Sequence, residues 1–260
     1  MATIVPKELI NSDQRRSLDE QGFFITEVLF DELTLEAVRH EFLRIWQQHI
    51  EKAKEADSVS QRLAETRPFL PRLHEVSPVC DAFCRHQVFL QLCRELLGPD
   101  ADTTWNQAIL KPPSTSDNAF AWHQDNWYAL NGEYANDSNL DALKSPDNSF
   151  MAWVAISRTT VDNGTLWVLP GRHKEGLLPH NWDDTRREWV GQFDTSWRIP
   201  AVMQAGQILI FRKHTPHGSG ANVSEETRMA YQIGYSVPGL KLGPSRDIVP
   251  VMRDGQPLRP

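Results

Sequence analysis

The sequence has little cysteine and no long hydrophobic run, and each shortage excludes a class of protein. The three cysteines, Cys80, Cys84 and Cys93, are too few for a disulfide framework. We expect them to be small buried side chains in a reducing compartment. No stretch approaches the roughly 18 apolar residues of a membrane span, and the opening "MATIVPKELINSDQ" lacks the apolar segment of a secretory signal. These features predict a soluble, cytoplasmic protein without a membrane partner.

A basic excess is also missing. The formal net charge is −7, whereas a surface that binds nucleic acid normally carries an excess of Lys and Arg. Nucleic acid is therefore not an expected partner. No Pro/Ser-rich linker, low-complexity tract or internal repeat divides the sequence. We expect one domain over residues 1–260, as a monomer or a homodimer.

Residues 1–99 carry mostly helical signals. Cap-type residues at 11–13 predict a helix that ends near Gly22, and the segment "FFIT" that follows predicts a short strand. Apolar residues at helical spacing predict a second helix from Glu32 to about Ala56 and a third from about Val79 to Leu97. This part of the chain is expected to be a helical support.

Residues 100–240 have a different texture. Short apolar or alternating segments, from "TTWNQAIL" to "RMAYQIGYSV", lie between clusters of Gly, Pro, Asn and Asp. Strands of this length with turn signals between them predict an all-β sandwich, jelly roll or barrel. The helices would pack on one face of its sheet, and residues 241–260 would form a C-terminal tail.

Two polar connections, residues 131–148 and residues 173–196, exceed the usual length of a hairpin loop. Connections of this length are commonly lids or binding loops. Simple surface decoration explains them equally well, so both hypotheses stay open.

The segment "WHQD" places a histidine and a carboxylate two positions apart. On a strand, successive side chains alternate faces, so His123 and Asp125 would point the same way and Gln124 the opposite way. An inward-facing pair of this kind can bind one cation, but the pair alone does not decide the question. A second His-x-acid triplet, residues 173–175, follows the turn "LPGR" and is expected to be a loop feature.

The later segment "FRKHTPHGSGANVSEETRMAYQIGY" carries two histidines, a Gly-Ser-Gly turn and an arginine on an expected strand. A third ligand from this segment, on a strand distant from His123 and Asp125, would complete a set of two His and one carboxylate, which leaves coordination positions open and suits non-heme Fe(II) working with O₂. The arginine offers a planar fork for a carboxylate, as a dicarboxylic cosubstrate needs.

Three segments in this order, "WHQD", "DNGTLWVLPGRH" and "HGSGANVSEETR", resemble the phytanoyl-CoA dioxygenase (PhyH-like) family of Fe(II)/2-oxoglutarate oxygenases. The resemblance runs from about "EQGFFI" to "YSVPG". It implies a mainly β fold with flanking α-helices, in which residues 100–240 form a double-stranded β-helix (jelly-roll, cupin-like) core and the N-terminal helices pack on one sheet. It also implies Fe(II), the cosubstrate 2-oxoglutarate, and O₂.

Carried over position by position, the resemblance implies His123, Asp125 and His217 as the iron ligands and catalytic centre. His217 is preferred to His214 because it directly precedes the Gly-Ser-Gly turn, as in the family.

The same resemblance implies the residues that hold the cosubstrate. Arg228 would bind the distal carboxylate of 2-oxoglutarate, with Ser219 assisting by a hydrogen bond. Lys111 in "AILKPP" matches a family position near the cosubstrate, and Trp153 in "FMAWVAIS" would be a wall of the same pocket. Four further aromatic residues are equally well explained as core fillers or as substrate contacts: Trp122, Trp127, Tyr128 and Trp167.

Asp125 bears on the reaction, because related halogenases have a small residue in its place. Its presence favours hydroxylation of an unactivated C–H bond, or a related desaturation or cyclisation, with release of succinate and CO₂. The sequence departs from the family at Arg172, where Ser is common, and at Gln207, where Asp is common, but neither is an expected ligand. The acidic composition disfavours a CoA ester, and the nine Trp residues suit a small-molecule substrate.

Two alternatives from other classes remain. A cupin-like metalloenzyme would use the same three ligands without 2-oxoglutarate and would have no use for Arg228. A non-catalytic small-molecule-binding jelly roll would have kept the fold, although such proteins usually lose their ligands. A serine hydrolase is not supported, because "HGSGAN" lacks the G-x-S-x-G turn around a nucleophilic serine.

Overall fold

The computed structural model describes residues 8–113, 118–131, 145–240 and 248–258. Its helices are α1 (Ser12–Glu20), α2 (Glu32–Ala53), α3 (Ser58–Thr66), α4 (Leu73–Val76), α5 (Pro78–Cys84), α6 (Gln87–Leu96) and α7 (Asp125–Asn131), with short 3₁₀ helices η2 (Pro146–Asn148) and η3 (Arg172–Glu175). Across the described ranges, none of these helices has the length and apolar character that a bilayer crossing requires.

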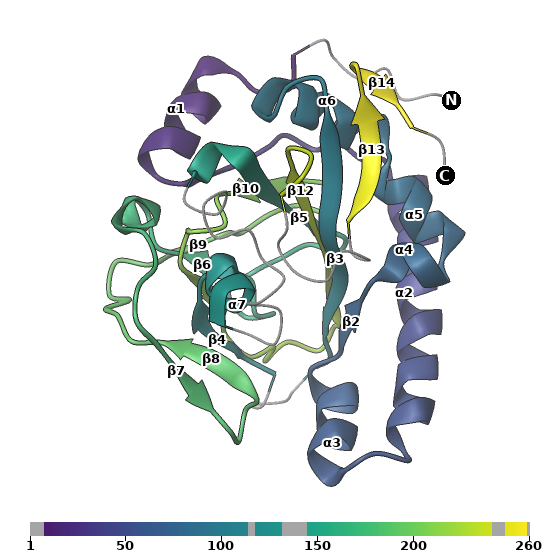
Figure 1. The fold of residues 1–260 in the computed structure, drawn as a ribbon. Coiled ribbons are helices and arrows are strands. Elements are labelled where there is room, and N and C mark those ends of the chain that lie inside the picture. The colour runs from purple at the N-terminus through teal and green to yellow at the C-terminus, as the bar shows by residue number, and fades with distance from the viewer. Residues whose placement is uncertain (1–7, 114–117, 132–144, 241–247, 259–260) are drawn as a thin grey trace.

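The strands form two main antiparallel sheets and one hairpin (Figure 1). The large sheet has the order β1-β10-β5-β12-β3-β13-β14, and β2 pairs with β3 beside this path; the small sheet has the order β4-β11-β6-β9, and β7 pairs with β8. Their bounds are β1 (Phe23–Ile25), β2 (Phe69–Pro71), β3 (Ala101–Lys111), β4 (Phe120–His123), β5 (Ser149–Ala155), β6 (Leu166–Val168), β7 (His180–Asp183), β8 (Glu188–Gly191), β9 (Ile199–Pro200), β10 (Ile208–Phe211), β11 (His217–Ser219), β12 (Arg228–Ser236), β13 (Val249–Arg253) and β14 (Gln256–Pro257). The expected double-stranded β-helix with flanking helices is confirmed.

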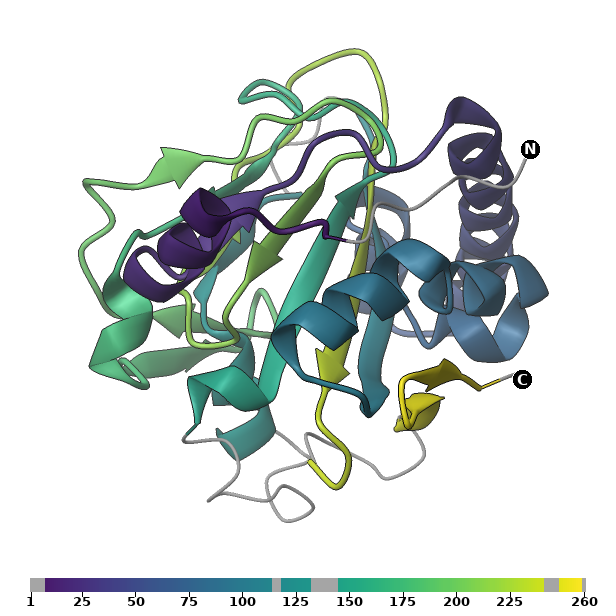
Figure 2. The ribbon, with the colours of Figure 1, turned by 90° about the horizontal axis from the view of Figure 1, so that it is seen from above.

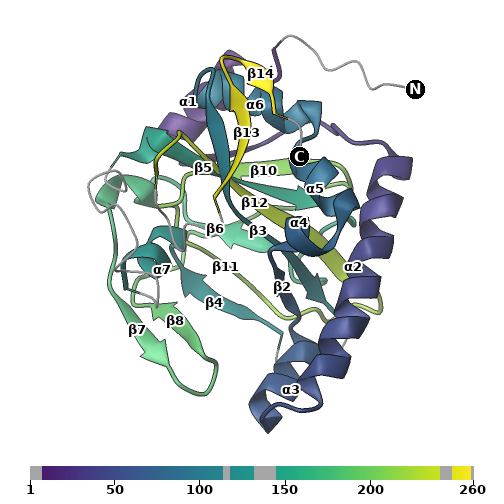
Figure 3. The ribbon, with the colours of Figure 1, turned by 45° about the vertical axis from the view of Figure 1, so that its right-hand side comes forward.

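Most of the N-terminal helices lie together on one side of the strands (Figure 2). The small sheet lies apart from this helical layer, with β4 and β11 side by side and the β7–β8 hairpin at its edge (Figure 3). The large sheet thus has helices on one face and the small sheet on the other, and the site described below lies between the sheets.

Side-chain alternation on β12 divides the interior into two cores. Tyr231, Ile233 and Tyr235 face the helices and belong to one buried cluster, whereas Ala230 belongs to a second cluster with residues of β5, β6 and β10. This two-residue period is what a strand covered on both faces requires. The inner face also carries polar side chains, Arg228 and Gln232, which are buried.

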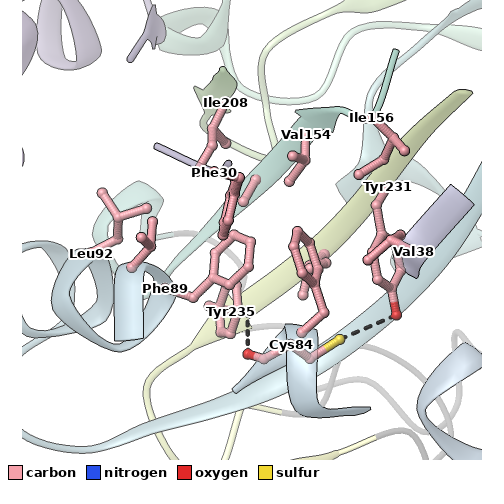
Figure 4. Close-up of a cluster of buried hydrophobic side chains, with 14 of the residues drawn as sticks. Phe30, Val38, Cys84, Phe89, Leu92, Val154, Ile156, Ile208, Tyr231 and Tyr235 are labelled. Atoms are coloured by element: carbon pink, nitrogen blue, oxygen red, sulfur yellow. Dashed lines mark hydrogen bonds between the residues drawn. The ribbon is translucent and has the colours of Figure 1, made fainter. Parts of the chain in front are cut away.

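Aromatic rings connect the helices to the outer face of the large sheet (Figure 4). Phe89 of α6 is fully buried, and its ring centroid lies 5.6 Å from that of Tyr235 and 5.4 Å from that of Phe30. The Tyr235 hydroxyl donates a hydrogen bond to the Cys84 carbonyl at 2.6 Å. All three cysteines are buried and free, as expected, and burial raises the pKa of Cys80 to about 11.

The helix boundaries follow from their caps. Asn11 caps α1 through a reciprocal pair of hydrogen bonds with Gln14, which confirms the helix expected there. The single helix expected from Val79 to Leu97 is wrong, because the segment divides into α5 and α6. His86 is extended, and its imidazole caps α6 by accepting from the Val88 amide.

The C-terminal range 241–260 was expected to be a tail. Its described residues instead contribute two strands, and β13 pairs antiparallel with β3 at the edge of the large sheet. Alternating apolar residues Val249, Val251 and the adjacent Met252 carry this signal in the sequence, and Val251 and Met252 are buried.

Truncating the aromatic contact at Phe89 should destabilise the fold. We expect Phe89→Ala to lower the free energy of unfolding by about 3–5 kcal/mol, because it removes a fully buried ring and leaves a cavity. Urea unfolding followed by circular dichroism measures this change. In the matched control Leu33→Ala the lost side chain is 79% exposed, and the change should stay within about 0.5 kcal/mol. Equal losses in the two variants would contradict this account of the core.

Candidate metal centre and active site

The pairing of β4 with β11 places His123 directly opposite His217. The prediction that Trp122 to Asp125 form one strand is wrong, because β4 ends at His123 and Asp125 begins α7. The turn between them occurs at Gln124, whose buried amide donates to the carbonyls of Gly176 and His214 at 2.8 and 2.6 Å. Asp125 therefore reaches the histidines from a helix N-terminus and not by strand alternation.

The three side chains meet at one point. Asp125 Oδ1 lies 3.7 Å from His123 Nε2 and 3.7 Å from His217 Nε2, and the ligand atoms all lie within 4.8 Å of one another. Metal–ligand bonds to nitrogen and oxygen are about 2.0–2.2 Å long, so one ion can contact all three atoms. Two His and one carboxylate on one side of an ion leave positions for other ligands.

Backbone carbonyls fix the two imidazole rings. His123 Nδ1 lies 2.7 Å from the Ala121 carbonyl oxygen, and His217 Nδ1 lies 3.0 Å from that of Thr215. A carbonyl can only accept, so each Nδ1 carries a proton and each Nε2 presents a lone pair to the shared point. Burial, and then the neighbouring His217, lowers the pKa of His123 to about 4, which keeps this ring neutral at physiological pH.

Gln232 orients the carboxylate of Asp125. Its Nε2 donates to Asp125 Oδ2 at 3.2 Å, while its Oε1 accepts from Gln107 Nε2 at 2.8 Å. This chain leaves Oδ1 facing the histidines. Neither glutamine was singled out in the sequence, but the alternation of β12 puts Gln232 on the same inner face as Arg228.

A narrow cavity lies beside the histidines, and Arg228 lines it. His123, His217, Ser219 and Trp153 also line this cavity. Arg228 is 1% exposed, and its two Nη atoms donate to the carbonyls of Ile109 and Gly164 at 3.1 and 3.3 Å.

The guanidinium of Arg228 retains unused hydrogen-bonding capacity. In the described ranges it forms no ion pair, and its buried Nε has no hydrogen-bond partner. The buried Nε1 of Trp153 also has no hydrogen-bond partner there, and the Trp153 ring lies 5.3 Å from the Arg228 Cζ. Burial lowers the pKa of Arg228 to about 9, so the group keeps its charge at neutral pH. A buried, charged donor of this kind fits an anionic ligand.

Lys111 contacts Ser219, a residue that lines the narrow cavity. Its Nζ donates to the Ser219 Oγ at 2.7 Å and also to the Gly220 carbonyl, and its residue is paired in register with Arg228. Burial, and then the charge of Arg228, lowers the pKa of Lys111 well below its ordinary value. The structure thus connects Lys111 to the cavity through Ser219, since Lys111 itself does not line it.

A second and much larger cavity, of about 810 Å³, begins at His123 and Asp125. Its walls come from α2, α3, β3 and the β7–β8 hairpin, and they are rich in aromatic side chains: Phe69, Trp105, Phe120, Tyr128, Trp182 and Trp189. Helix α3 was not predicted from the sequence, although Asp57 caps it. Tyr128 is one of the four aromatic residues that could be either core fillers or substrate contacts, and it lines this cavity.

The connection 173–196 contributes the β7–β8 hairpin to this cavity. A buried ion pair holds the hairpin in place, since Arg67 Nη1 lies 2.9 Å from Glu188 Oε1 and both side chains are less than 10% exposed. Glu188 also accepts from the Ala121 amide at 3.2 Å. The hairpin is therefore a wall of the cavity. Of the other long connection, 131–148, residues 132–144 lie outside the described residues.

The remaining histidine candidates lie away from the shared point. His173 is in η3, where its Nε2 lies 3.3 Å from the Asp19 carbonyl oxygen. His214 Nε2 lies 3.3 Å from the side-chain nitrogen Nδ2 of Asn126. Within the described residues, the group able to hold a metal comprises His123, Asp125 and His217.

Solved structures with a similar fold include EvdO2 and SnoK. EvdO2 from Micromonospora carbonacea var. aurantiaca, complexed with 2-oxoglutarate, is 20% identical with a TM-score of 0.65, over 92% of this chain and 96% of that chain. The non-heme alpha ketoglutarate dependent carbocyclase SnoK from nogalamycin biosynthesis is 19% identical with a TM-score of 0.68, over 98% and 96% of the two chains. These similarities establish a shared fold.

Two relatives found by sequence comparison are named as dioxygenases. The peroxisomal phytanoyl-CoA dioxygenase of Bos taurus is 26% identical over 88% of this chain and 69% of its own length. The ectoine dioxygenase of Bordetella bronchiseptica is 23% identical over 92% of this chain and 79% of its own length.

The fold, the His-Asp-His group and these relatives define the class of protein, a non-heme iron and 2-oxoglutarate-dependent oxygenase. Residues 18–230 match the family model for phytanoyl-CoA dioxygenase (PhyH), and the chain belongs to this family. The resemblance inferred from the three motifs is confirmed.

The buried His180 predicts a pH-dependent stability. Its Nδ1 donates to the Leu178 carbonyl at 2.7 Å, its Nε2 accepts from the Gln124 amide at 3.2 Å, and burial lowers its pKa to about 4. The unfolded chain, with a histidine pKa near 6.5, binds more protons between about pH 4 and 6.5. Stability should therefore fall as the pH drops through this window, by at most about 1.4 kcal/mol per pH unit for this group.

Urea unfolding of the metal-free protein at several pH values measures this dependence. In His180→Gln the contribution should disappear, whereas the exposed His40→Gln controls for the loss of a histidine. A pH dependence that is the same in His180→Gln and the wild type would contradict the role of the neutral ring.

Proposed function

We propose that this chain is an Fe(II)- and 2-oxoglutarate-dependent dioxygenase that hydroxylates an unactivated C–H bond of a small molecule and releases succinate and CO₂. One observation carries the proposal. The His-Asp-His group lies at the junction of two cavities, a narrow one lined by Arg228 and a wide one lined by aromatic side chains.

His123, Asp125 and His217 would hold the iron. The fit is supported by the two Nε2 lone pairs and the one carboxylate oxygen that converge on a single point, each fixed by a hydrogen bond on its other atom. Second contacts of this kind set ring orientation and ligand basicity in metal sites. When bound, Fe(II) and 2-oxoglutarate would together activate O₂ for attack on the C–H bond of the substrate.

Arg228 and Ser219 would hold the distal carboxylate of 2-oxoglutarate. The support is the unpartnered Nε of a fully buried guanidinium in a cavity that also contains the metal-binding histidines. Lys111 would position Ser219 through its 2.7 Å hydrogen bond, and Trp153 would limit the width of the cavity. These buried side chains would exclude water from the narrow cavity and fix the orientation of 2-oxoglutarate.

The wide cavity would bind the organic substrate. At about 810 Å³ it has the size of small-molecule sites in general, which are about 300–1,000 Å³. Structural neighbours of this chain include a carbocyclase and an epimerase, SnoK and SnoN from nogalamycin biosynthesis. Asp125 favours hydroxylation, since it fills the position that a halide would need.

We further propose a cytoplasmic location. Three buried free thiols support a reducing compartment. The peroxisomal location in the name of the bovine relative belongs to that protein.

Two substitutions test the separate roles of the two cavities. Asp125→Ala should lose iron and abolish the release of succinate from 2-oxoglutarate, because it removes one of three ligands. Arg228→Met should keep its iron but need about 10- to 100-fold more 2-oxoglutarate for half-maximal succinate release, the usual effect of losing hydrogen bonds to a charged group. For each variant, the bound iron is measured by the absorption of a chelator complex, and the released succinate is measured by a coupled assay.

Arg198→Met serves as the matched control, because Arg198 is exposed and lines neither cavity. An unchanged 2-oxoglutarate requirement in Arg228→Met would contradict the placement of the distal carboxylate on this residue, whereas no succinate release by the iron-loaded wild type would favour the cupin-like alternative, which does not use 2-oxoglutarate. Full succinate release by Asp125→Ala would contradict the assignment of the metal ligands.

A further inference from the structure

The wide cavity contains a buried lysine that neither the metal ligands nor the cosubstrate pocket uses. Lys213 follows β10, lines the cavity of about 810 Å³ and is 6% exposed. It does not line the narrow cavity, where Arg228 is the basic residue. The two cationic side chains therefore serve different cavities that meet at His123.

The ammonium of Lys213 has little compensation for its burial. Its Nζ donates to the Thr104 Oγ1 at 3.0 Å, and across the described ranges it forms no ion pair. An ammonium has three donors, so this contact uses one of them. Burial lowers the pKa of Lys213 to about 7, while Asp125 acts in the opposite direction. A buried charge without a counter-ion is costly unless a ligand supplies the missing partner.

The chain leaves room for this lysine. A Cβ at position 234 would lie 3.4 Å from Lys213 Nζ, 3.1 Å from Met151 Sδ and 2.9 Å from Thr104 Oγ1. Glycine at position 234 thus keeps open the space that these three side chains share. Four other polar side chains of the same cavity are already paired, since Gln107 and Gln232 bond each other and Arg67 bonds Glu188.

We propose that Lys213 and Thr104 bind a carboxylate of the organic substrate, so that this enzyme acts on small carboxylic acids with an apolar body. The inference rests on the proposed function and specifies its substrate class. One cation and one hydroxyl match a single negative charge, whereas a phosphate dianion would call for more donors near Asp125. The aromatic walls, with Trp105 and Trp189 among them, would cover the apolar part.

This anchor would make Lys213 a specificity-determining residue. It lies in the same cavity as His123 and Asp125, so a bound carboxylate would set which C–H bond of the substrate is presented to the metal. The cosubstrate carboxylate would remain with Arg228 in the narrow cavity.

A panel of paired acids and amides tests the proposal. The probes are benzoate, phenylacetate, 3-phenylpropionate and 4-phenylbutyrate, each with its primary amide, titrated anaerobically into the protein loaded with Fe(II) and 2-oxoglutarate. Tryptophan fluorescence reports binding, because Trp105 and Trp189 line the cavity. In the wild type at least one acid should bind about 10- to 100-fold more tightly than its amide, since only the acid pairs with the ammonium.

Lys213→Met should remove this preference and leave the 2-oxoglutarate requirement unchanged, and Thr104→Val should weaken it. Lys52→Met is the matched control, because Lys52 lines the same cavity but is exposed, and it should keep the preference. Indistinguishable acids and amides in the wild type, or a preference that survives in Lys213→Met, would overturn the proposal. A raised 2-oxoglutarate requirement in Lys213→Met would also overturn it and assign the lysine to the cosubstrate.

The weak visible charge-transfer band of the loaded protein is recorded before each titration, and the panel is repeated on the metal-free protein. A missing band would speak against the proposed function, whereas the acid–amide preference of the metal-free protein tests the lysine separately.

Discussion

The register between β4 and β11 is the constraint on which the site depends. It places His123 opposite His217, and the carbonyls of Ala121 and Thr215 then turn both Nε2 atoms toward one point. A shift of one residue would send one imidazole to the other face of the small sheet. The turn at Gln124 adds Asp125 from the start of α7, so one strand pair and one turn assemble all three ligand atoms.

The large sheet determines what lies on either side of that point. Its outer face packs on the helices through rings such as Phe89 and Tyr235, which leaves its inner face free to carry polar side chains. On this inner face of β12, Arg228 lines the narrow cavity and Gln232 donates a hydrogen bond to Asp125. Burial of a charge without an ion-pair partner among the described residues recurs at Arg228 and at Lys213, and in both places we propose that an anionic ligand supplies the partner.

Local patterns in the sequence predicted much of this and missed what depends on distant contacts. The motifs indicated His123, Asp125 and His217 together, and the structure brings their ligand atoms within 4.8 Å of one another. The strand geometry assumed for Asp125 was wrong, because the turn at Gln124 is held by carbonyls 52 and 90 residues away in sequence. The pair of Arg67 with Glu188, which spans 121 residues, leaves no local signal either. No local pattern marks Lys213 either, because its burial follows from tertiary packing alone.

The most direct measurement of the central claim is anaerobic titration of the protein with Fe(II) and 2-oxoglutarate, followed by visible absorption. If one iron is held at the junction of the two cavities and 2-oxoglutarate chelates it there, a weak charge-transfer band should develop only when both are present, and it should saturate at one equivalent of iron. No band with both components present, together with no uncoupled release of succinate in air, would contradict this account.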